Sequence, residues 1–274
     1  MLSLAARFST SPFFGETVPR ERGDVFAIRA KQMYQNFIPE NYNFARNLRY
    51  LQGCILLAFY NLSSIPELFG WHLTGDCIRL AYDLELDKTD ADVTTEQLSR
   101  SGSWLSPENW VLREEKRRAW WSVWELDSFL STLSNWPYAI DQQQMRVLLP
   151  SPDANWQSNS PIASRFLASD ISLMWKSLQD CPNQDVRAWF LVAKGLMLQV
   201  HATSRRSTLS SKAVETLDSA LSCFCLLLPE DFQVDAGAPT FNQSSFQSDN
   251  WIIAIHILLQ RYPQLVANGL LLMS

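Results

Sequence analysis

The sequence has few glycines, few histidines and no long apolar run. Nine glycines in 274 residues leave little material for the glycine-rich loops that bind phosphates or dinucleotides, and no such motif occurs. The three histidines, His72, His201 and His256, are far apart and none has HExxH spacing, so we expect no metal site. No apolar run approaches the roughly 18 to 20 residues of a membrane-spanning helix. These patterns predict neither an enzyme nor a membrane protein.

The five cysteines form no CxxC pair. Cys54 and Cys77 fall in apolar helical rows, which predicts buried free thiols in a reducing compartment. Cys223 and Cys225 are two residues apart and would point to different faces of a helix, so they make a poor metal pair. Cys181 is remote from both in the sequence. We therefore expect no cofactor bound by cysteines in this chain.

The composition is that of a globular chain. Hydrophobic residues make up 47% of the sequence and 11 residues are tryptophan, which excludes disorder as the general state. The net charge is −5, without the basic excess expected of a free-standing nucleic-acid binder. We therefore expect no direct DNA binding by this chain.

The tryptophan-rich stretch at residues 106–150 predicts a long helix followed by an extended strap. Ser106 is a good N-cap, and Pro137 disfavours helical geometry before it, so the helix should end near Asn135. We call residues 139–150 the strap. Apolar residues recur every three or four positions along the helix. The expected inward row is Ala119, Val123, Leu126, Leu130 and Leu133, flanked by Trp120, Trp124 and Asp127.

Charged residues of this helix allow two interpretations. Glu114 precedes Arg117 by three residues and Arg118 by four, a spacing that favours ion pairs. Arg117 and Arg118 would then tie the helix to acidic neighbours while the tryptophans fill the core. Alternatively, Arg117 stacks on Trp120 or Trp121 as a cation–π pair.

A functional alternative concerns the same helix. Trp120, Trp124 and Asp127 lie in one row along a side of the helix and could line an effector pocket between helices, with Asp127 as its polar anchor. No other group of residues in the sequence has comparable functional potential.

This arrangement resembles the middle homology region of fungal zinc-cluster transcription factors. Residues 70–84 and 250–263 look like an earlier and a later helix of that family, so the resemblance covers roughly residues 20–263. The matching residues of the central stretch are Glu115, Arg117, Arg118, Trp120, Trp121, Trp124, Leu126, Asp127, Pro137, Ile140, Leu149 and Pro150.

The resemblance implies an all-α regulatory domain without catalytic machinery, which acts on transcription in the nucleus. Its expected partners are transcriptional machinery, a DNA-binding partner or a second copy, and a small-molecule effector. The family binds zinc through six closely spaced cysteines, and this sequence lacks them. Two alternatives remain: a helical enzyme or ligand-binding protein of small-molecule metabolism, or a truncated non-functional remnant.

We expect a single multi-helix domain of packed antiparallel helices over residues 19–274, shortened at its C-terminus, after a flexible tail at residues 1–18. Gly75 should permit a close helix approach, and Asn183 should cap a helix. Residues 85–105 should form a solvated acidic loop. Besides the central one, helices are expected near 20–37, 43–62, 67–84, 162–178, 184–206, 211–228 and 250–262, the second and third as a hairpin.

Overall fold

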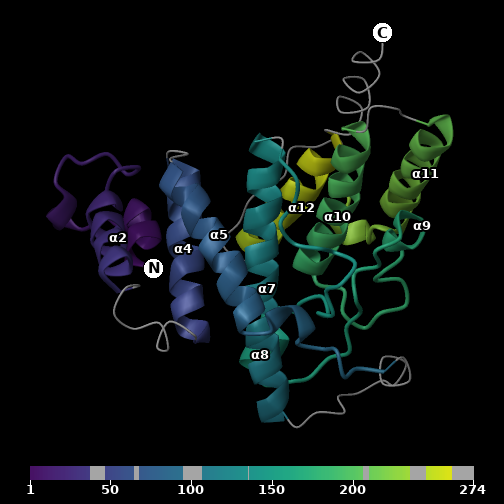
Figure 1. Ribbon diagram of the computed structural model, residues 1–274, viewed down its shortest axis with the longest axis horizontal. Helices are drawn as coiled ribbons and strands as arrows, with labels where there is room; N and C mark the ends of the chain where they lie inside the picture. Colours follow the sequence, from purple (N-terminus) through teal and green to yellow (C-terminus); the bar gives the residue numbers. More distant parts are fainter. Residues whose placement is uncertain are drawn as a thin grey trace. The chain divides into compact units, whose positions relative to one another are not determined.

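The computed structural model describes residues 1–37, 47–64, 68–94, 107–134, 136–205, 210–234 and 245–260 (Figure 1). Within these ranges all regular secondary structure is helical, and one isolated antiparallel β-bridge pairs Leu148 with Phe166. The predicted all-α fold is therefore confirmed. Ser106, Asn135 and the apolar C-terminal residues lie outside the described residues, as does the acidic segment beyond residue 94.

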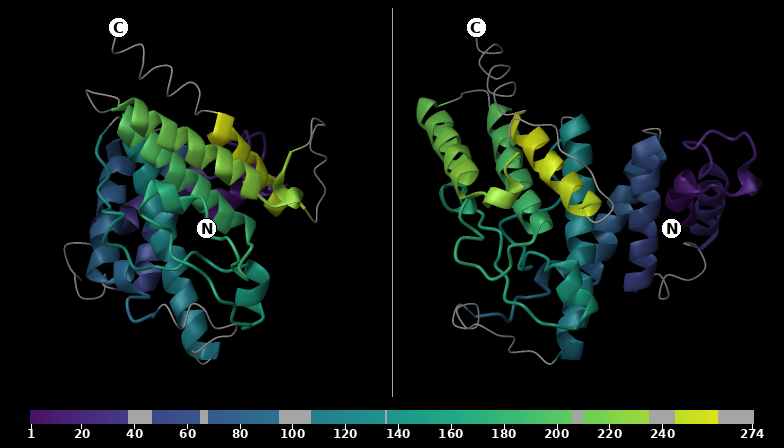
Figure 2. Two further views of the ribbon diagram at one scale, coloured as in Figure 1. Left: turned by 90° about the vertical axis from the view of Figure 1, so that its right-hand side faces the viewer. Right: turned by 180° about the vertical axis from the view of Figure 1, so that it is seen from behind.

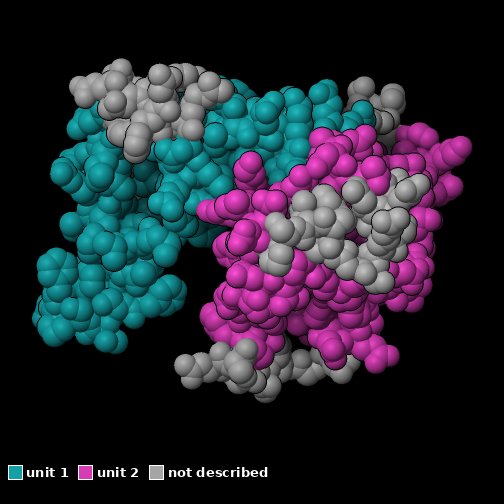
Figure 3. All heavy atoms as spheres, turned by 90° about the horizontal axis from the view of Figure 1, so that it is seen from below, with its two compact units in different colours: residues 1–89, 118–145 teal, residues 90–117, 146–274 magenta. Residues whose placement is uncertain are grey.

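The chain divides into two compact units, coloured separately in Figure 3. Unit 1 comprises residues 1–89 and 118–145, and unit 2 comprises residues 90–117 and 146–274. One boundary falls inside the central helix, α7 (Pro107–Ser134), and another inside the strap. The expectation of one domain over residues 19–274 stays a prediction, and each unit is described by itself.

Unit 1 contains a pair of packed helices, α4 and α5, which lie side by side in Figure 1. A Cβ atom built on Gly70, near the start of α5, would lie 3.0 Å from a methyl carbon of Leu62, near the end of α4. This places the two connected ends together, as the predicted hairpin requires. Besides part of α7, the elements of unit 1 are α1 (Leu2–Ala5), η1 (Ala6–Phe8), η2 (Pro12–Phe14), α2 (Asp24–Phe37), α4 (Leu48–Ser64), α5 (Leu68–Asp83) and η3 (Leu86–Lys88).

The close helix approach was predicted at the wrong glycine. A Cβ atom on Gly75 would meet only the Arg79 side chain of its own helix, so Gly70 is the glycine in the tight contact. Three residues of the predicted inward rows, Met33, Phe59 and Leu133, are exposed. On α4 the buried face runs through Ala58 instead, one residue from Phe59. A bulky apolar side chain next to a small one does not reveal which of them faces the core.

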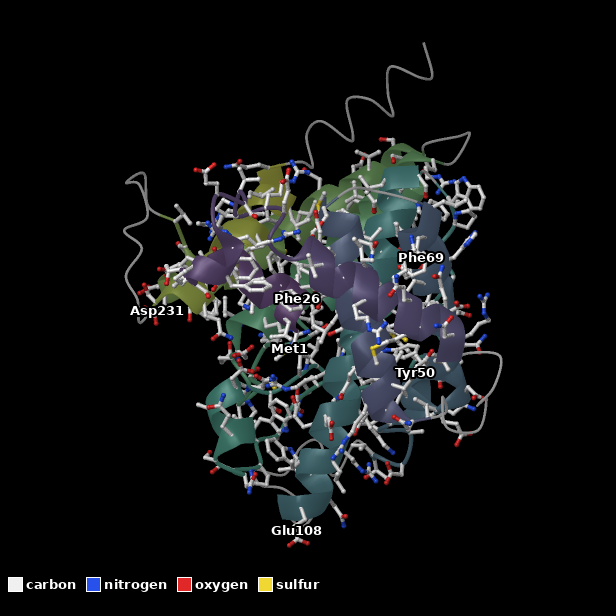
Figure 4. All side chains as sticks on the ribbon, turned by 90° about the vertical axis from the view of Figure 1, so that its left-hand side faces the viewer. Met1, Phe26, Tyr50, Phe69, Glu108 and Asp231 are labelled. Carbon is white, nitrogen blue, oxygen red and sulfur yellow. The ribbon has the colours of Figure 1, made fainter. Side chains whose placement is uncertain are left out.

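Residues 2–8 and 12–14 form short helices in the segment expected as a tail. Ser3 and Ala6 are buried, and the Arg7 guanidinium donates to Ser64 Oγ at 2.5 Å. A Cβ atom on Gly23 would lie 2.1 Å from the Ser3 carbonyl oxygen. The start of the chain therefore packs against α2 and α4, whose Phe26 and Tyr50 are labelled in Figure 4. The flexibility of residues 1–18 and the boundary at residue 18 stay predictions.

This packing makes Gly23→Ala a sensitive test of how residues 1–7 are held. The added methyl group has no room beside Ser3, so we expect the free energy of unfolding to fall by about 1–3 kcal/mol, as overpacking does. Urea denaturation measures the loss. The matched control is Gly53→Ala in α4, where a Cβ atom meets nothing within 4 Å. It should stabilise the helix by about 0.4–1 kcal/mol, and equal effects of the two substitutions would contradict the contact.

Unit 2 is organised around α10 (Val186–Ser204), which contacts α11 (Ser211–Leu227) and α12 (Phe246–Gln260) on either side (Figure 2). Trp189 packs against Phe224 of α11, with ring centroids 5.7 Å apart, and Phe190 against Trp251 of α12 at 4.8 Å. The remaining elements are part of α7, α8 (Asp153–Gln157), α9 (Ile171–Met174) and η4 (Glu230–Phe232). The predicted inward rows are buried at Val186, Trp189, Ala193, Leu196, Val200, Leu217, Leu221, Phe224 and Leu228.

The helix predicted over residues 162–178 is wrong for most of its length, since only α9 is regular helix there. The chain before α9 pairs with the end of the strap instead. Leu149 N donates to Arg165 O at 2.8 Å, and Ser164 Oγ donates to Leu149 O at 2.7 Å. These bonds use backbone groups at residues 149 and 165 that a helix would satisfy internally.

The predicted cap at Asn183 is also wrong. Asp185 caps α10, because its carboxylate accepts from Arg187 N at 3.0 Å. Asn183 is fully buried, and its Nδ2 donates to Pro150 O and Ser164 Oγ, both at 2.9 Å. The amide therefore fixes the end of the strap rather than the helix. The last helix begins at Phe246, three residues before the predicted Asp249.

All five cysteines lie within the described residues and are free. Cys54 and Cys77 are buried as predicted, Cys181 is also buried, Cys223 is half-buried and Cys225 is exposed. Burial raises the pKa of the Cys54 thiol to about 12, which keeps it protonated at neutral pH. None of the helices in the described ranges is long and apolar enough to cross a membrane.

Candidate functional site

The candidate site consists of α7 and the strap, which carry the motif residues. Two buried polar clusters lie on them, one in each unit. We call Asp90, Glu114 and Arg117 of unit 2 the Arg117 cluster. We call Asp127 with the backbone of residues 139 and 140 in unit 1 the Asp127 turn.

The Arg117 cluster is a buried network of three charged side chains. The Arg117 guanidinium binds Asp90 through two hydrogen bonds, from Nε at 2.8 Å and from Nη2 at 2.7 Å. Its Nη1 donates to Glu114 Oε2 at 3.2 Å. Arg117 is 2% exposed, and both carboxylates are fully buried. Such two-bond pairing with a carboxylate is geometrically specific and stronger than a neutral hydrogen bond.

The same carboxylates bind the end of the strap. Asp90 Oδ2 accepts from Leu148 N at 2.9 Å, and Glu114 Oε1 accepts from Ser151 N at 2.8 Å. In addition, Asp90 N donates to Arg146 O at 2.9 Å. The cluster thus joins α7, the segment around Asp90 and residues 146–151. These hydrogen bonds hold the three chain segments in one arrangement.

Electrostatics accounts for a charged network in the interior. Burial opposes the charge of Arg117, but its hydrogen bonds to Asp90 and the charges of Asp90 and Glu114 raise its pKa above the ordinary value. Arg113 lies at the edge, 3.8 Å from Asp90, and binds Asp92 through two bonds of 2.6 Å. Those bonds lower the pKa of Asp92. The positive charge of Arg113 partly offsets the surplus carboxylate of the cluster.

The prediction of a solvated acidic loop is wrong for Asp87 and Asp90, which are buried. Asp90 is 27 residues from Arg117 in the sequence, and no periodic pattern connects them. The predicted pairing of Glu114 with Arg117 is confirmed. The one available signal for the missed aspartate was Arg117 itself, because an arginine close to a tryptophan-rich core needs a buried counter-charge.

The Asp127 turn holds the beginning of the strap. The two carboxylate oxygens accept from Ala139 N at 3.2 and 3.1 Å, and Oδ2 accepts from Ile140 N at 3.0 Å. Ser131 Oγ lies 3.4 Å from both Asp127 Oδ1 and Pro137 O. Asp127 therefore fixes the chain where it leaves α7, a role that the sequence interpretation of a pocket anchor did not anticipate.

The motif tryptophans are buried in unit 1. Trp120, Trp121 and Trp124 are at most 1% exposed, and Trp121 meets Trp124 edge to face at 5.2 Å. Trp120 makes a similar contact with Tyr82 of α5 at 5.5 Å. This geometry supports the interpretation that the tryptophans fill the core.

The remaining motif residues have varied surroundings. Glu115 and Arg118 are half-buried, and Pro137 is exposed. Ile140 and Pro150 are buried at the two ends of the strap, where Pro150 O accepts from Asn183. Within the described part of the chain, no group of three or more histidine, cysteine, aspartate or glutamate side chains is placed to hold a metal ion.

Asp127→Asn tests the turn. An asparagine offers one acceptor oxygen instead of two, and its NH₂ group would face backbone N–H donors. We expect a loss of about 1–3 kcal/mol in the free energy of unfolding, the cost of leaving buried polar groups unsatisfied. Thermal and urea unfolding measure it. The matched control is Asp141→Asn at an exposed position, which should stay within about 0.5 kcal/mol of the original chain.

Comparison with curated proteins finds relatives that are fungal transcription regulators. The chain is 32% identical over 127 residues to the "Pigment biosynthesis transcriptional activator pigB" of Monascus ruber, covering 46% of this chain and 22% of that protein. It is 32% identical over 128 residues to the "Tropolone cluster transcription factor tropK" of Talaromyces stipitatus, covering 47% and 21%. A longer match, 26% over 218 residues, links it to the "Zn(2)-C6 fungal-type transcription factor FTF1c" of Fusarium oxysporum f. sp. lycopersici, covering 79% and 22%.

The chain thus spans about a fifth of the length of these relatives. No solved structure matches it. The family described as "Fungal specific transcription factor domain" matches residues 1–252, a range that includes α7, the strap and both clusters. Because that match covers most of the 274 residues, the chain belongs to the fungal specific transcription factor domain family.

Proposed function

We propose that this chain regulates transcription as the regulatory and protein-interaction domain of a fungal transcription factor. The observation that carries the proposal is the family match over residues 1–252, together with relatives that are named transcriptional activators. The two buried clusters support a structural role for the residues of the family motif. Their hydrogen bonds connect α7 to the strap, so the motif maintains the domain that presents a partner surface.

A tethering experiment tests this function. The full chain is fused to a heterologous sequence-specific DNA-binding domain and expressed in a fungal host that carries a reporter with the matching sites. We expect reporter transcription to differ several-fold from that given by the DNA-binding domain alone. Arg117→Met should abolish the difference, and Arg113→Met, at the edge of the cluster, should preserve it. A fusion that leaves the reporter at the level of the DNA-binding domain alone would contradict the proposal.

The location and partners follow from the same proposal. The chain acts in the nucleus and reaches DNA through a DNA-binding partner, without contacting DNA itself. A fluorescent fusion should accumulate in nuclei, and purified chain should not shift a panel of DNA duplexes in a gel at physiological salt. Cytosolic fluorescence, or a sequence-specific shift by the chain alone, would count against these parts of the proposal.

Binding of a small-molecule effector is the second candidate function, and one observation favours it. The indole Nε1 of Trp120 is buried and has no hydrogen-bond partner in the described structure, so an acceptor atom of a ligand would satisfy it. Titration with a panel of metabolites should change tryptophan fluorescence in the original chain. Trp120→Phe keeps an aromatic ring but removes the donor, and should lose the response. An unchanged spectrum across the panel would remove support for an effector at Trp120.

A further inference from the structure

We propose that Ser64, the last residue of α4, is a phosphorylation site whose phosphate is bound by Arg7 and Arg20. Both arginines already hold this residue. Arg7 Nη2 donates to Ser64 Oγ at 2.5 Å, and Arg20 Nη2 donates to Ser64 O at 2.7 Å. All three residues belong to unit 1.

A second observation points to an anion at the same place. The Nε atom of Arg7 is buried and has no hydrogen-bond partner in the described structure. Neither Arg7 nor Arg20 forms an ion pair with a carboxylate of the described residues. Arg7 also lies over the Tyr60 ring, 4.9 Å from its centroid, which fixes its guanidinium beside the end of α4. A phosphate has three oxygens that can accept from Arg7 Nε and from the two guanidinium groups that already donate to Ser64.

The surrounding charges favour the same assignment. Asp24 accepts a hydrogen bond from Tyr60 at 2.5 Å, and its carboxylate forms no ion pair with Arg7 or Arg20. Arg22 is directed elsewhere, toward the carbonyl oxygens of Ser9 and Thr17. Two cations thus remain for an added dianion. Ser64 is half-buried, with its neighbour Ser63 exposed, so a kinase would meet this end of the helix at the surface.

The chemical step is a phosphoryl transfer from a nucleoside triphosphate by a protein kinase. Ser64 Oγ forms a bond to the γ-phosphorus, and the bond from that phosphorus to the β,γ-bridging oxygen breaks. A nucleoside diphosphate leaves, and the hydroxyl proton passes to the kinase. The phosphoserine then binds Arg7 and Arg20 and holds residues 1–22 against α4.

A stabilising effect of phosphorylation is unusual at this position. Negative charge at the C-terminal end of a helix is normally unfavourable, because the last carbonyl groups carry partial negative charge. Ser63 therefore provides a matched control. It lies in the same turn, its Oγ donates to Tyr60 O at 3.1 Å, and no arginine of the described residues forms a hydrogen bond with it.

The test incorporates phosphoserine at position 64 or 63 of the full chain by genetic code expansion. Phosphoserine at 64 should raise the melting temperature by about 2–4 °C and slow tryptic cleavage after Arg20 and Arg22. Phosphoserine at 63 should lower the melting temperature. A decrease at position 64 like that at position 63 would overturn the proposal.

Two variants separate the arginine clamp from other causes. Arg7→Met combined with Arg20→Met should convert the gain from phosphoserine at 64 into a loss. Arg7 is half-buried and its replacement could unfold residues 1–7, so Arg20→Met alone serves as the second variant, because Arg20 is exposed. It should at least halve the shift in melting temperature. An unchanged shift in both variants would show that the arginines do not bind the phosphate.

Discussion

Replacing Arg117 by methionine is expected to lower the free energy of unfolding by about 3–5 kcal/mol. The substitution preserves most of the side-chain volume but leaves Asp90 and Glu114 buried without their cation. Those carboxylates lose three hydrogen bonds, and their mutual repulsion is no longer offset. Equilibrium urea denaturation followed by circular dichroism measures the change.

The matched control is Arg113→Met, four residues earlier on the same helix. Its bonds to Asp92 are short, but the Arg113 side chain is 25% exposed and that of Asp92 56% exposed, so water screens the pair. We expect a loss of about 0–1 kcal/mol, the range of surface ion pairs. If the two variants are equally stable, the Arg117 cluster does not hold unit 2 together in the way its geometry indicates.

Trp120→Ala is expected to cost about 3–5 kcal/mol, as deletions of large aromatic side chains from a core do. Trp120 is fully buried and packs against Tyr82, so its removal creates a cavity between α5 and α7 that the neighbours cannot fill without moving. Thermal unfolding and near-ultraviolet circular dichroism report the loss of stability and of aromatic packing.

Trp136→Ala is the matched control for this deletion. Trp136 also makes an edge-to-face contact, with Trp71 at 5.2 Å, but it is 62% exposed. Its removal should cost about 0.5–1.5 kcal/mol, the value of such an aromatic pair. A negligible melting shift for Trp120→Ala would mean that this residue is not part of the core.

Local sequence patterns predicted the helices well where one face is strongly apolar. The three- and four-residue spacing of α7, α10 and α11 gave the correct type and most of the correct inward residues, because burial of one face dominates those helices. The same reasoning failed over residues 162–178, where only α9 is regular helix. There the apolar residues Leu167, Met174 and Leu178 are buried in a mostly irregular segment, since the strap supplies hydrogen bonds that periodicity cannot detect.

The polar clusters were only half predictable for a related reason. Glu114 and Arg117 lie one helical turn apart, so their pairing is local and follows from spacing. Asp90 and Asp127 bind groups that are remote in the sequence or belong to the backbone. Sequence patterns predict that a carboxylate in a polar stretch is solvated, unless its partner is already known. For the same reason the role of Asn183 was not predicted, because its amide binds the remote backbone of the strap.

The division of the chain has a consequence for synthesis on the ribosome. Neither unit is continuous in sequence, so no single cut releases both intact. Every residue of unit 1 has been made once Met145 is added, while Asp90 and Glu114 still lack the amide groups of Leu148 and Ser151. Those groups follow within six residues, the interval from Met145 to Ser151. A chain that ended between these points would leave the two carboxylates with Arg117 as a partner but without these backbone amide donors.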